Sequence, residues 1–452
     1  MYLIILLLFM FPCNVLSMKI SNMNNIRVKS NPPVELLRCR AWKKCRTRLK
    51  TSLSQVGCDS RRGWIRVFER WQLICKLSED LDSSEIPKDH QLDPLIPTLD
   101  TKLSHSILIA ELTALDGMDS KRANSVADGL IEYAKNMASG VTKLEDQVSV
   151  DAPGVGTVSI KSKDEKLRKW NSESHSITET DMNTIEMYMG TTQQVFPLTR
   201  DAFGKLSKAW QSNNHHTIPK QEFLNDLFCL LVRYHALEGW GNQAAITPGV
   251  FTCLSNTFGV NTECFASALN HVLPNYHSMF PDLEIGFGSS GSFFNIESFN
   301  PDEGSFEANP PFVQILMLEM LFKMHRLLQK ATGPMSFAVI VPAWTDEESW
   351  MSLCASPYLT HEPIVIQASD HSYADGSGYR RADWDGRARP APFNTAVFFL
   401  QNEKGKEKWP LNESTEASLR QAFKSAVPDE NLVKRQVKEG LYVPKKKRNQ
   451  VE

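Results

Sequence analysis

The stretch Gly304-Ser305-Phe306-Glu307-Ala308-Asn309-Pro310-Pro311-Phe312 is the point around which the rest of the chain is organised. A short, partly apolar run leads into two prolines, which fix φ and cannot donate ladder hydrogen bonds. A helical pattern begins directly after them. We therefore expect Asn309 to stand at the end of a strand, with its amide directed outward.

An asparagine and an aromatic ring in this position could bind an adenine base. The Asn309 side chain both accepts and donates hydrogen bonds, as recognition of an adenine edge requires, and Phe312 offers a face for base stacking. The amine of adenine is a poor nucleophile because its lone pair is delocalised into the ring. A site that accepts both amine hydrogens, from the asparagine and from a backbone carbonyl, restores the lone pair and directs it at a methyl donor.

A short motif also fits a proline-rich turn between a strand and a helix, and this alternative stays open from the tetrapeptide alone. The chain holds a second copy, Asn31-Pro32-Pro33-Val34, which ends in an aliphatic residue within a polar region. We interpret that copy as part of a linker.

Composition indicates a globular protein of two or three domains: 452 residues, 42% hydrophobic and 23% charged. The net charge of -2 does not indicate a nucleic-acid binder, but the charges are unevenly distributed. Seven basic residues and no acid lie between Arg38 and Lys50. Such a run neutralises phosphates, with a solvated helix face as the alternative.

The cysteines and the two ends of the chain give information on the cellular compartment of the protein. The nine cysteines show no CxxC pair and no Cys/His cluster with zinc spacing, so we expect neither a disulfide framework nor a metal. Residues 2–11 are almost wholly apolar, which leaves a secretory or targeting leader open, with Met18 as an alternative start. This run is too short for a spanning helix, so we expect no stable membrane anchor. The basic run 444–448 predicts a nuclear location, and a solvated tail is its alternative.

The domain organisation follows from changes in pattern along the chain. We predict a disordered leader and linker over residues 1–33 and a helical domain over 34–250, with a polar insertion at 138–180. An α/β domain is expected over 251–412, and a helical tail with a basic run over 413–452.

Within the α/β part, short apolar runs alternate with helical patterns, as in a doubly wound sheet. Strands are predicted at 263–267, 285–295, 304–310, 335–341, 363–368 and 394–401, with helices at 268–273 and 313–330. Ser267, Asn309 and Trp344 then all lie at carboxyl ends of strands. Ligands of open α/β sheets bind at that edge, which strengthens the catalytic interpretation of the motif.

Several stretches in a fixed order make the chain resemble a known family. They are 263–270, 280–282 with 287–289, 304–312, 337–344, and 394–402 with 408–409. Together they resemble the catalytic core of the phosphorylated-CTD-interacting-factor family, densely over about 250–410 and more weakly over the preceding helices. The resemblance implies a class I (Rossmann-like) S-adenosylmethionine-dependent methyltransferase domain preceded by a mainly α-helical domain. It also implies methylation of N6 of a 2′-O-methyladenosine next to a 7-methylguanosine cap on RNA polymerase II transcripts.

The resemblance assigns roles to residues of this chain. It places catalysis at Asn309, Pro310, Pro311 and Phe312. Residues matching the cofactor site are Glu263, Phe265, Ala266, Ser267 and Asn270, together with Asn309. Residues matching the capped-RNA site are Phe312, Gln314, Pro342 and Trp344, with Arg38 and Arg46 as the nearest candidates for the cap phosphates. Trp344 suits a cationic methylated guanine, because aromatic rings attract cations; a core tryptophan is the alternative. The resemblance implies no metal.

The chain departs from the family pattern in three places. Gln314 stands where the family usually carries an acid. The acidic run 346–348 follows Trp344, and negative charge is unfavourable near a triphosphate. No WW module is visible, so binding to the phosphorylated polymerase tail through such a module is not expected. Two other functions therefore stay open: an adenine N6-methyltransferase acting on internal RNA or DNA, and a catalytically inactive protein that binds caps or RNA.

Overall fold

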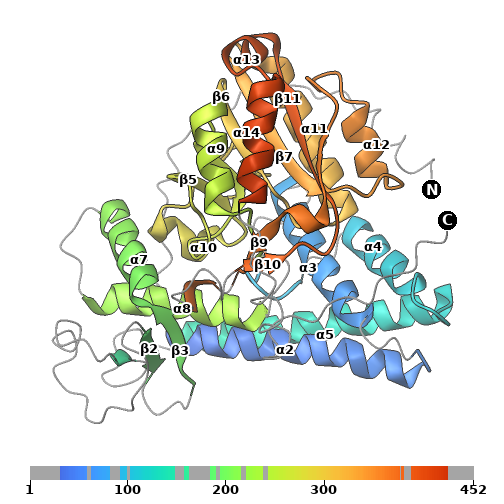
Figure 1. Cartoon of the computed structure of the whole chain (residues 1–452). Helices are drawn as coiled ribbons and strands as arrows, with labels where there is room; N and C mark the ends of the chain where they lie inside the picture. The colour runs from blue at the N-terminus through green and yellow to red at the C-terminus, as the bar shows by residue number, and fades with distance from the viewer. Residues whose placement is uncertain are drawn as a thin grey trace.

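A six-stranded sheet flanked by helices stacks on a base of long helices in the computed structural model of the protein (Figure 1). The structure describes residues 31–58, 63–81, 92–98, 102–147, 157–161, 184–189, 194–214, 220–237, 243–376, 378–380 and 388–425. Residues 1–30 of the leader and linker predicted over 1–33, and the basic run at 444–448, lie outside these ranges.

Six helices lie in the described residues up to position 237, before the chain enters the sheet. They are α2 (Pro32–Gln55), α3 (Gly63–Leu81), α4 (Lys102–Thr113), α5 (Ser120–Gln147), α7 (Arg200–Asn213) and α8 (Lys220–Leu237). Figure 1 shows α2 and α5 running side by side along the base, and α2 also packs on α8. Trp42, Phe68 and Trp71 are fully buried and meet edge to face in the core between α2 and α3.

A three-stranded antiparallel sheet accompanies these helices, with strands β1 (Val158–Lys161), β2 (Thr184–Met189) and β3 (Phe196–Thr199) in that order. The predicted polar insertion at 138–180 is therefore partly regular structure. Helix α5 continues through its first part, because Ala138 and Val141 are buried on the apolar side of that helix. Strand β1 then brings Val158 and Ile160 into the same core.

The linker interpretation of Asn31-Pro32-Pro33-Val34 is wrong. Asn31 is the N-cap of α2, and its side-chain oxygen accepts a hydrogen bond from the Val34 amide at 3.3 Å. Pro32 and Pro33 open the helix, where the missing amide hydrogens would have no helical partner. The same tetrapeptide chemistry thus starts a helix here.

The central sheet is of the predicted α/β class. Its strands are β4 (Thr262–Ala266), β5 (Asn275–Ser278), β6 (Gly304–Ala308), β7 (Met335–Pro342), β8 (Ile364–Ile366) and β11 (Thr395–Gln401). The spatial order is β5-β4-β6-β7-β11-β8. Strands β5, β4, β6 and β7 are parallel, whereas β11 runs antiparallel to both of its neighbours. Four strands therefore end at the same edge of the sheet.

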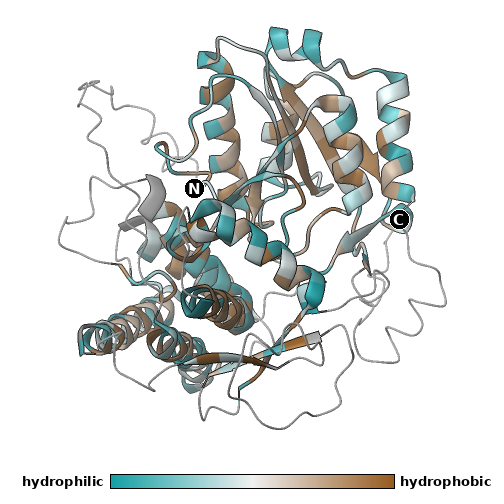
Figure 2. Ribbon diagram, turned by 90° about the vertical axis from the view of Figure 1, so that its left-hand side faces the viewer, coloured by the Kyte–Doolittle hydropathy of each residue, from teal (hydrophilic) through white to brown (hydrophobic). Residues whose placement is uncertain are grey.

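Helices cover both faces of this sheet. Helix α11 (Gln314–Lys330) and helix α12 (Glu348–Cys354) pack on one face, and α9 (Pro248–Phe258) and α14 (Glu413–Lys424) pack on the other. Figure 2 shows the hydrophobic strands enclosed between these helices. Helix α9 crosses the predicted domain boundary after residue 250, and α14 belongs to the sheet layer although it was predicted as tail.

Short elements connect the strands. They are α10 (Pro281–Glu284), η2 (Ile285–Phe287), η3 (Ala368–Asp370), β9 (Ser372–Ala374), η4 (Gly378–Arg380), β10 (Ala388–Pro390) and α13 (Glu403–Lys408). The strand predicted at 285–295 is wrong. The second strand is β5, which lies earlier in the chain, and residues 285–287 form the short helix η2. Gly288 and Gly291 adopt positive φ angles of 95° and 98°, which interrupt an extended run.

Helix α13 approaches the start of β7 so closely that only glycine fits at position 405. A Cβ atom added there would lie 2.2 Å from the carbonyl oxygen of Met335. We expect Gly405→Ala to lower the free energy of unfolding by about 1–3 kcal/mol through overpacking. Chemical denaturation measures this. Gly129→Ala in α5 is the control: nothing lies within 4 Å of its added Cβ, so it should stabilise the helix slightly. Equal effects of the two changes would contradict the close approach.

Candidate active site

Asn309 directly follows the last residue of β6, at the edge where the parallel strands end. After Pro310 the chain turns tightly, and the Val313 amide donates to the Pro311 carbonyl at 2.7 Å before α11 begins at Gln314. Asn309 is half-buried, and within the described ranges its side chain has no hydrogen-bond partner. Its amide is thus held in a rigid turn and remains available for a ligand.

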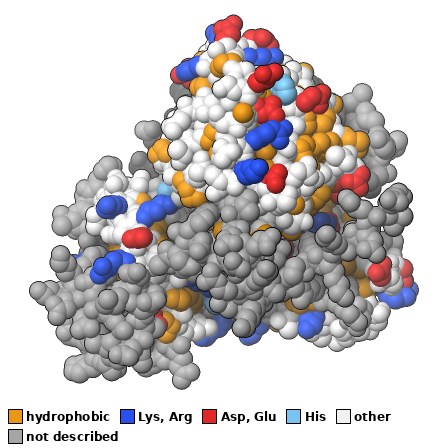
Figure 3. Space-filling model, in the orientation of Figure 1, with side chains coloured by type: hydrophobic (Ala, Val, Ile, Leu, Met, Phe, Trp, Pro, Cys, Tyr) orange, Lys and Arg blue, Asp and Glu red, His pale blue; other side chains and the backbone are white. Residues whose placement is uncertain are grey.

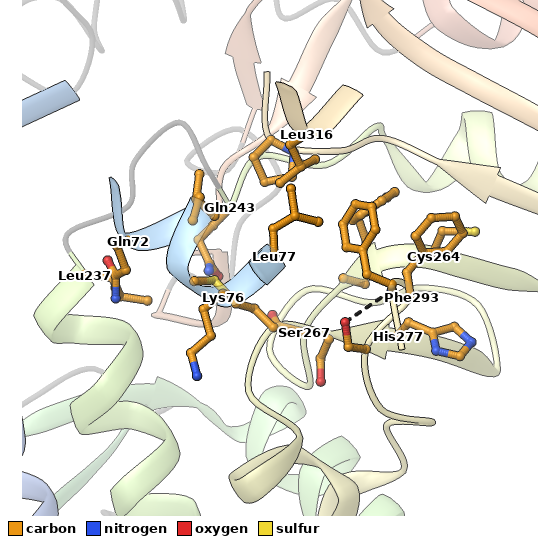
Figure 4. A pocket seen from close by; sticks show the side chains of 18 of the residues that line it. Gln72, Lys76, Leu77, Leu237, Gln243, Cys264, Ser267, His277, Phe293 and Leu316 are labelled. Atoms are coloured by element: carbon orange, nitrogen blue, oxygen red, sulfur yellow. Dashed lines mark hydrogen bonds between the residues drawn. The ribbon is translucent and has the colours of Figure 1, made fainter. Parts of the chain in front are cut away.

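A cavity of about 140 Å³ lies against this strand edge (Figure 4). Phe265, Ala266 and Ser267 line it at the end of β4, and Ser278 and Met279 line it at the end of β5. The Asn309 and Pro311 side of the cavity comes from the end of β6. The structure therefore brings together the predicted cofactor residues Phe265, Ala266, Ser267 and Asn270 with Asn309.

The opposite wall of the cavity comes from the helices that precede the sheet. It includes Trp42 of α2, Tyr234 and Leu237 of α8, and from α3 the residues Glu69, Gln72, Leu73, Lys76 and Leu77. Figure 4 shows Leu77 on the helix side facing Phe293 and Leu316 across the cavity. Sequence reasoning missed this wall. The helical periodicity of α3 indicated a buried face, but it carried no signal for which other part of the chain meets that face.

The loop after β4 is held by side chains. The side-chain Oδ1 of Asn270 accepts from the Ser267 amide at 2.7 Å and from the Ser267 hydroxyl at 2.9 Å. The carboxylate of Glu263 accepts from the amides of Val272 and Leu273 at 2.6 and 2.7 Å. These amides are thus paired with side chains, and the predicted helix at 268–273 is wrong. Glu263 is only 2% exposed and supports the loop from behind, outside the cavity lining.

A second support for this loop comes from Glu284 of α10. One of its carboxylate oxygens accepts from the Ala268 amide at 2.6 Å, and the other accepts from the Tyr234 hydroxyl at 2.5 Å. Burial raises the pKa of Glu284 to about 8, against the two hydrogen bonds, which lower it. Glu284 thus connects α8 and α10 to the loop that lines the cavity.

This buried carboxyl predicts a pH dependence of stability. In the unfolded chain Glu284 loses its proton near its ordinary pKa of 4.5, and in the folded protein near 8. The folded state binds more protons in between, so stability falls as pH rises from about 5 through 8. Burial also raises the pKa of Glu263, to about 7, and so adds to the same trend.

Urea denaturation at pH 6 and pH 9 tests this dependence. Glu284→Gln cannot ionise, so the variant should lose less stability between the two pH values than the natural protein does. An unchanged difference in the variant would contradict the assignment to Glu284.

Phe312 and Trp344 lie in an aromatic cluster outside the cavity lining. The Phe312 ring centroid lies 6.2 Å from that of Trp344, 5.6 Å from Phe393 and 6.5 Å from Tyr373. Trp344 and Phe393 are 5.6 Å apart, and all four contacts are edge to face. Phe312 and Trp344 are half-buried, so the cluster keeps part of its aromatic surface open.

Two further predicted capped-RNA residues are tied into the fold. Pro342 is buried at the end of β7, where it pairs with Thr395 of β11. The side-chain Oε1 of Gln314 accepts from the Ser349 amide at 3.1 Å and so joins α11 to α12. The Nε2 atom of Gln314 is buried without a hydrogen-bond partner in the described part of the chain.

Arg38 does not reach the cavity, which corrects its prediction as a phosphate ligand. Its guanidinium is bound by the carboxylates of Glu35, Asp93 and Glu145 at 2.7 to 3.3 Å, and the residue is 7% exposed. Arg46 is closer to the site. Its guanidinium carbon lies 5.6 Å from the ring centroid of Trp42, which lines the cavity, and 5.5 Å from that of Trp64.

The described residues contain no group of three or more His, Cys, Asp or Glu side chains placed to hold a metal ion. Within the same ranges, no helix has the length and apolar character needed to cross a membrane.

Comparison with known proteins covers the part of the chain that forms the site. The family model described as "Phosphorylated CTD interacting factor 1 WW domain" matches residues 205–376, which include β4, β6, Asn309 and α11. The chain is related to the phosphorylated-CTD-interacting-factor family. The resemblance predicted from the sequence is thereby confirmed. The matched residues form helices and the parallel strands of the central sheet.

Two curated proteins show the same relationship. The human "mRNA (2'-O-methyladenosine-N(6)-)-methyltransferase" is 34% identical over 243 residues, which cover 50% of this chain and 34% of the human protein. The mouse protein of the same name is 34% identical over 241 residues, covering 52% of this chain and 33% of the mouse protein. The chain thus spans about a third of the length of these relatives.

Proposed function

We propose that this protein is an S-adenosylmethionine-dependent adenine N6-methyltransferase, acting on the (2′-O-methyl)adenosine next to the 7-methylguanosine cap of mRNA. The observation that carries the proposal is the position of Asn309. Its amide, which has no protein partner within the described residues, lines the same cavity as Phe265, Ala266 and Ser267. The names of the human and mouse relatives support the same reaction.

The sheet supports assignment to the class I (Rossmann-like) methyltransferase fold, with a helical domain before it. Such a fold has parallel strands that end at a donor site and one antiparallel strand next to the edge strand. Here β4 and β5 end at the cavity, and antiparallel β11 lies between β7 and the edge strand β8. This is also where open α/β sheets bind their ligands.

The donor pocket would be formed by residues on three strand ends. Ala266 and Ser267 are small and let a ligand approach the backbone after β4. Phe265 packs against Phe293 and Phe294, with ring centroids 4.9 and 5.7 Å away, and these rings offer an apolar wall for the adenosine half of the donor. When bound, S-adenosylmethionine supplies an electrophilic methyl group.

Asn309 and the Pro310 carbonyl would orient the substrate amine. The Asn309 side-chain oxygen accepts one N6 hydrogen, and the Pro310 carbonyl accepts the other. The nitrogen lone pair would then point at the methyl group. The new carbon–nitrogen bond would replace the carbon–sulfur bond of the donor, and the N6 proton, which becomes acidic once that bond has formed, would pass to water. The rate comes from orientation and from fixed dipoles.

The aromatic cluster of Phe312, Trp344, Tyr373 and Phe393 would hold the purine and cap rings. A 7-methylguanine ring is cationic, and aromatic faces attract cations. This attraction contributes about 2 kcal/mol to binding where water is excluded. We expect Trp344→Ala to raise KM for capped RNA about tenfold, with little change in KM for uncapped RNA. Initial rates on both substrates measure this. An equal rise for both would place Trp344 in general packing.

Methyl transfer itself tests the proposal. Labelled S-adenosylmethionine is offered with a short RNA carrying a 7-methylguanosine cap and a first 2′-O-methyladenosine, and with the same RNA lacking the cap. Labelling that depends on the cap supports the proposal. Equal labelling of both RNAs would favour an enzyme for internal adenosines. Donor binding without transfer to RNA or DNA would favour a protein that only binds caps or RNA.

The proposed setting is the nucleus, where transcripts receive their caps. The family name and the basic run at 444–448 support this location. Capped RNA is the proposed partner, and the proposal includes no binding to the polymerase tail through a WW module.

A further inference from the structure

Helix α2 carries a basic outer face that the proposed active site does not use. Arg40, Lys44, Arg48 and Lys50 are exposed, and Lys43 is half-exposed beside them. Glu35 is the last acidic residue of the helix, so the remaining twenty residues of α2, 36–55, carry no negative charge. Across the part of the chain that the structure describes, neither Arg40 nor Lys44 has an ion-pair or hydrogen-bond partner. The described part of the fold therefore gives these two cations no role.

The spacing of these charges follows one side of the helix. Arg40, Lys44 and Arg48 lie four residues apart, so they are neighbours on the surface, separated by about 6 Å of helical rise. Like charges at this spacing destabilise a helix by a few tenths of a kcal/mol. A regular row of cations matches a polymer that carries regularly spaced negative charges, such as the backbone of a nucleic acid strand.

The basic face is continuous with the cavity wall. Trp42 of α2 lines the cavity, and the Arg46 guanidinium lies over both Trp42 and Trp64. The Lys50 ammonium lies 5.8 Å from the Trp64 ring centroid. Cations therefore run from the cavity around α2 to its outer side. In Figure 3, Lys and Arg side chains appear along the lower edge of the molecule, where Figure 1 places α2 and α5.

We propose that this face, defined as Arg40, Lys43, Lys44, Arg48 and Lys50, binds the sugar–phosphate backbone of single-stranded RNA beyond the methylated nucleotide. The RNA identity rests on the proposed function, but binding at this face does not depend on methyl transfer. A half-exposed aromatic ring, Trp64, lies among the cations, and interleaved aromatic and basic groups favour a single strand over an acidic peptide. Binding of this kind carries no base specificity.

Fluorescence anisotropy with a labelled, uncapped oligouridylate of about 15 nucleotides tests the proposal. The variant is Arg40→Ala/Lys44→Ala, which removes two exposed cations and leaves good helix formers. The control is Lys208→Ala/Lys424→Ala, which removes two exposed cations from α7 and α14. Each phosphate contact on a single strand contributes about 0.7 to the slope of log K against log salt.

We expect the first double variant to lower that slope by about 1.4 and the affinity at ~0.1 M salt about tenfold or more. The control double variant should behave as the natural protein does. Equal weakening in both doubles would show that net charge alone attracts the RNA, and no weakening in the first would show that α2 does not bind it. Displacement of the RNA by polyglutamate at lower concentration than by unlabelled RNA would assign the face to acidic protein. Each of these three outcomes overturns the proposal.

A kinetic comparison separates this inference from the proposed function. On a minimal capped dinucleotide, Arg40→Ala/Lys44→Ala should transfer methyl groups at the natural rate, whereas KM for a long capped RNA should rise about tenfold. An unchanged KM for long RNA would overturn the inference while the enzyme assignment stands. A protein that transfers no methyl group but loses oligouridylate affinity in the variant would overturn the enzyme assignment alone.

Discussion

Replacing Asn309 with alanine is expected to lower kcat for methyl transfer by about 10²–10³-fold, the cost of removing one fixed hydrogen-bonding group that acts on the reacting atoms. Asn309 is half-buried and pairs with no other described residue, so its truncation breaks no protein hydrogen bond. The melting temperature should therefore stay unchanged. Single-turnover transfer from labelled donor measures the loss.

Donor binding separates this role from a structural one. Phe265, Ala266 and Ser267 line the side of the cavity that we propose for the donor, and they are intact in Asn309→Ala. We therefore expect the Kd for S-adenosylhomocysteine, measured by calorimetry, to change by less than the transfer rate does. Asn256→Ala in α9 is the control, because Asn256 is exposed on a helix of the same domain. Full methyl-transfer activity in Asn309→Ala would contradict the proposed mechanism. An equal loss of S-adenosylhomocysteine affinity and of transfer rate would show that Asn309 binds the donor.

The position of Asn309 was predictable because local chemistry decides it. Two prolines cannot continue a strand, and a helical pattern follows them, so the chain must turn at this point. The sheet class was predictable for a similar reason, since β7 and β11 are mostly apolar and are buried along their whole length. The site residues on the strand ends follow from these two facts.

The parts that could not be predicted depend on contacts between distant segments. Arg38 looked like a phosphate ligand within a basic run, but Asp93 and Glu145 come from remote parts of the chain to neutralise it. The wall from α3 closes the cavity in the same way. Asn31 shows a different limit, because the same Asn-Pro-Pro sequence starts a helix there and follows the end of a strand at Asn309.

Replacing Arg233 with methionine is expected to lower the free energy of unfolding by about 3–5 kcal/mol, the cost of leaving a buried charge without its partner. Arg233 of α8 is fully buried, and two of its guanidinium nitrogens donate to the Glu35 carboxylate of α2 at 2.8 Å. A third nitrogen donates to Asp282 of α10 at 2.6 Å. The variant would leave Glu35 buried with Arg38 as its remaining ionic partner.

The same ion pairs predict an acid-sensitive step. The Arg233 and Arg38 guanidinium groups hold the pKa of Glu35 at about 2, against burial, which raises it. The unfolded chain binds a proton at Glu35 near pH 4.5, whereas the folded protein does not. The stability that Glu35 contributes is therefore complete above about pH 5 and is lost as pH falls toward 2. Arg233→Met should show a smaller loss between pH 5 and 3, because part of this contribution is already gone.

Loss of Arg233 should also affect binding at the proposed donor pocket. Arg233 holds Asp282 on α10, and Glu284 of the same short helix accepts from the Ala268 amide in the loop that lines the cavity. Loosening α10 therefore frees that loop, so we expect Arg233→Met to weaken S-adenosylhomocysteine binding at a temperature where the protein remains folded. Arg66→Met is the matched control, because Arg66 is exposed on α3. Equal unfolding curves for the two variants would refute the buried ion pairs as a source of stability. Equal Kd values for S-adenosylhomocysteine, measured by calorimetry, would refute their link to the site.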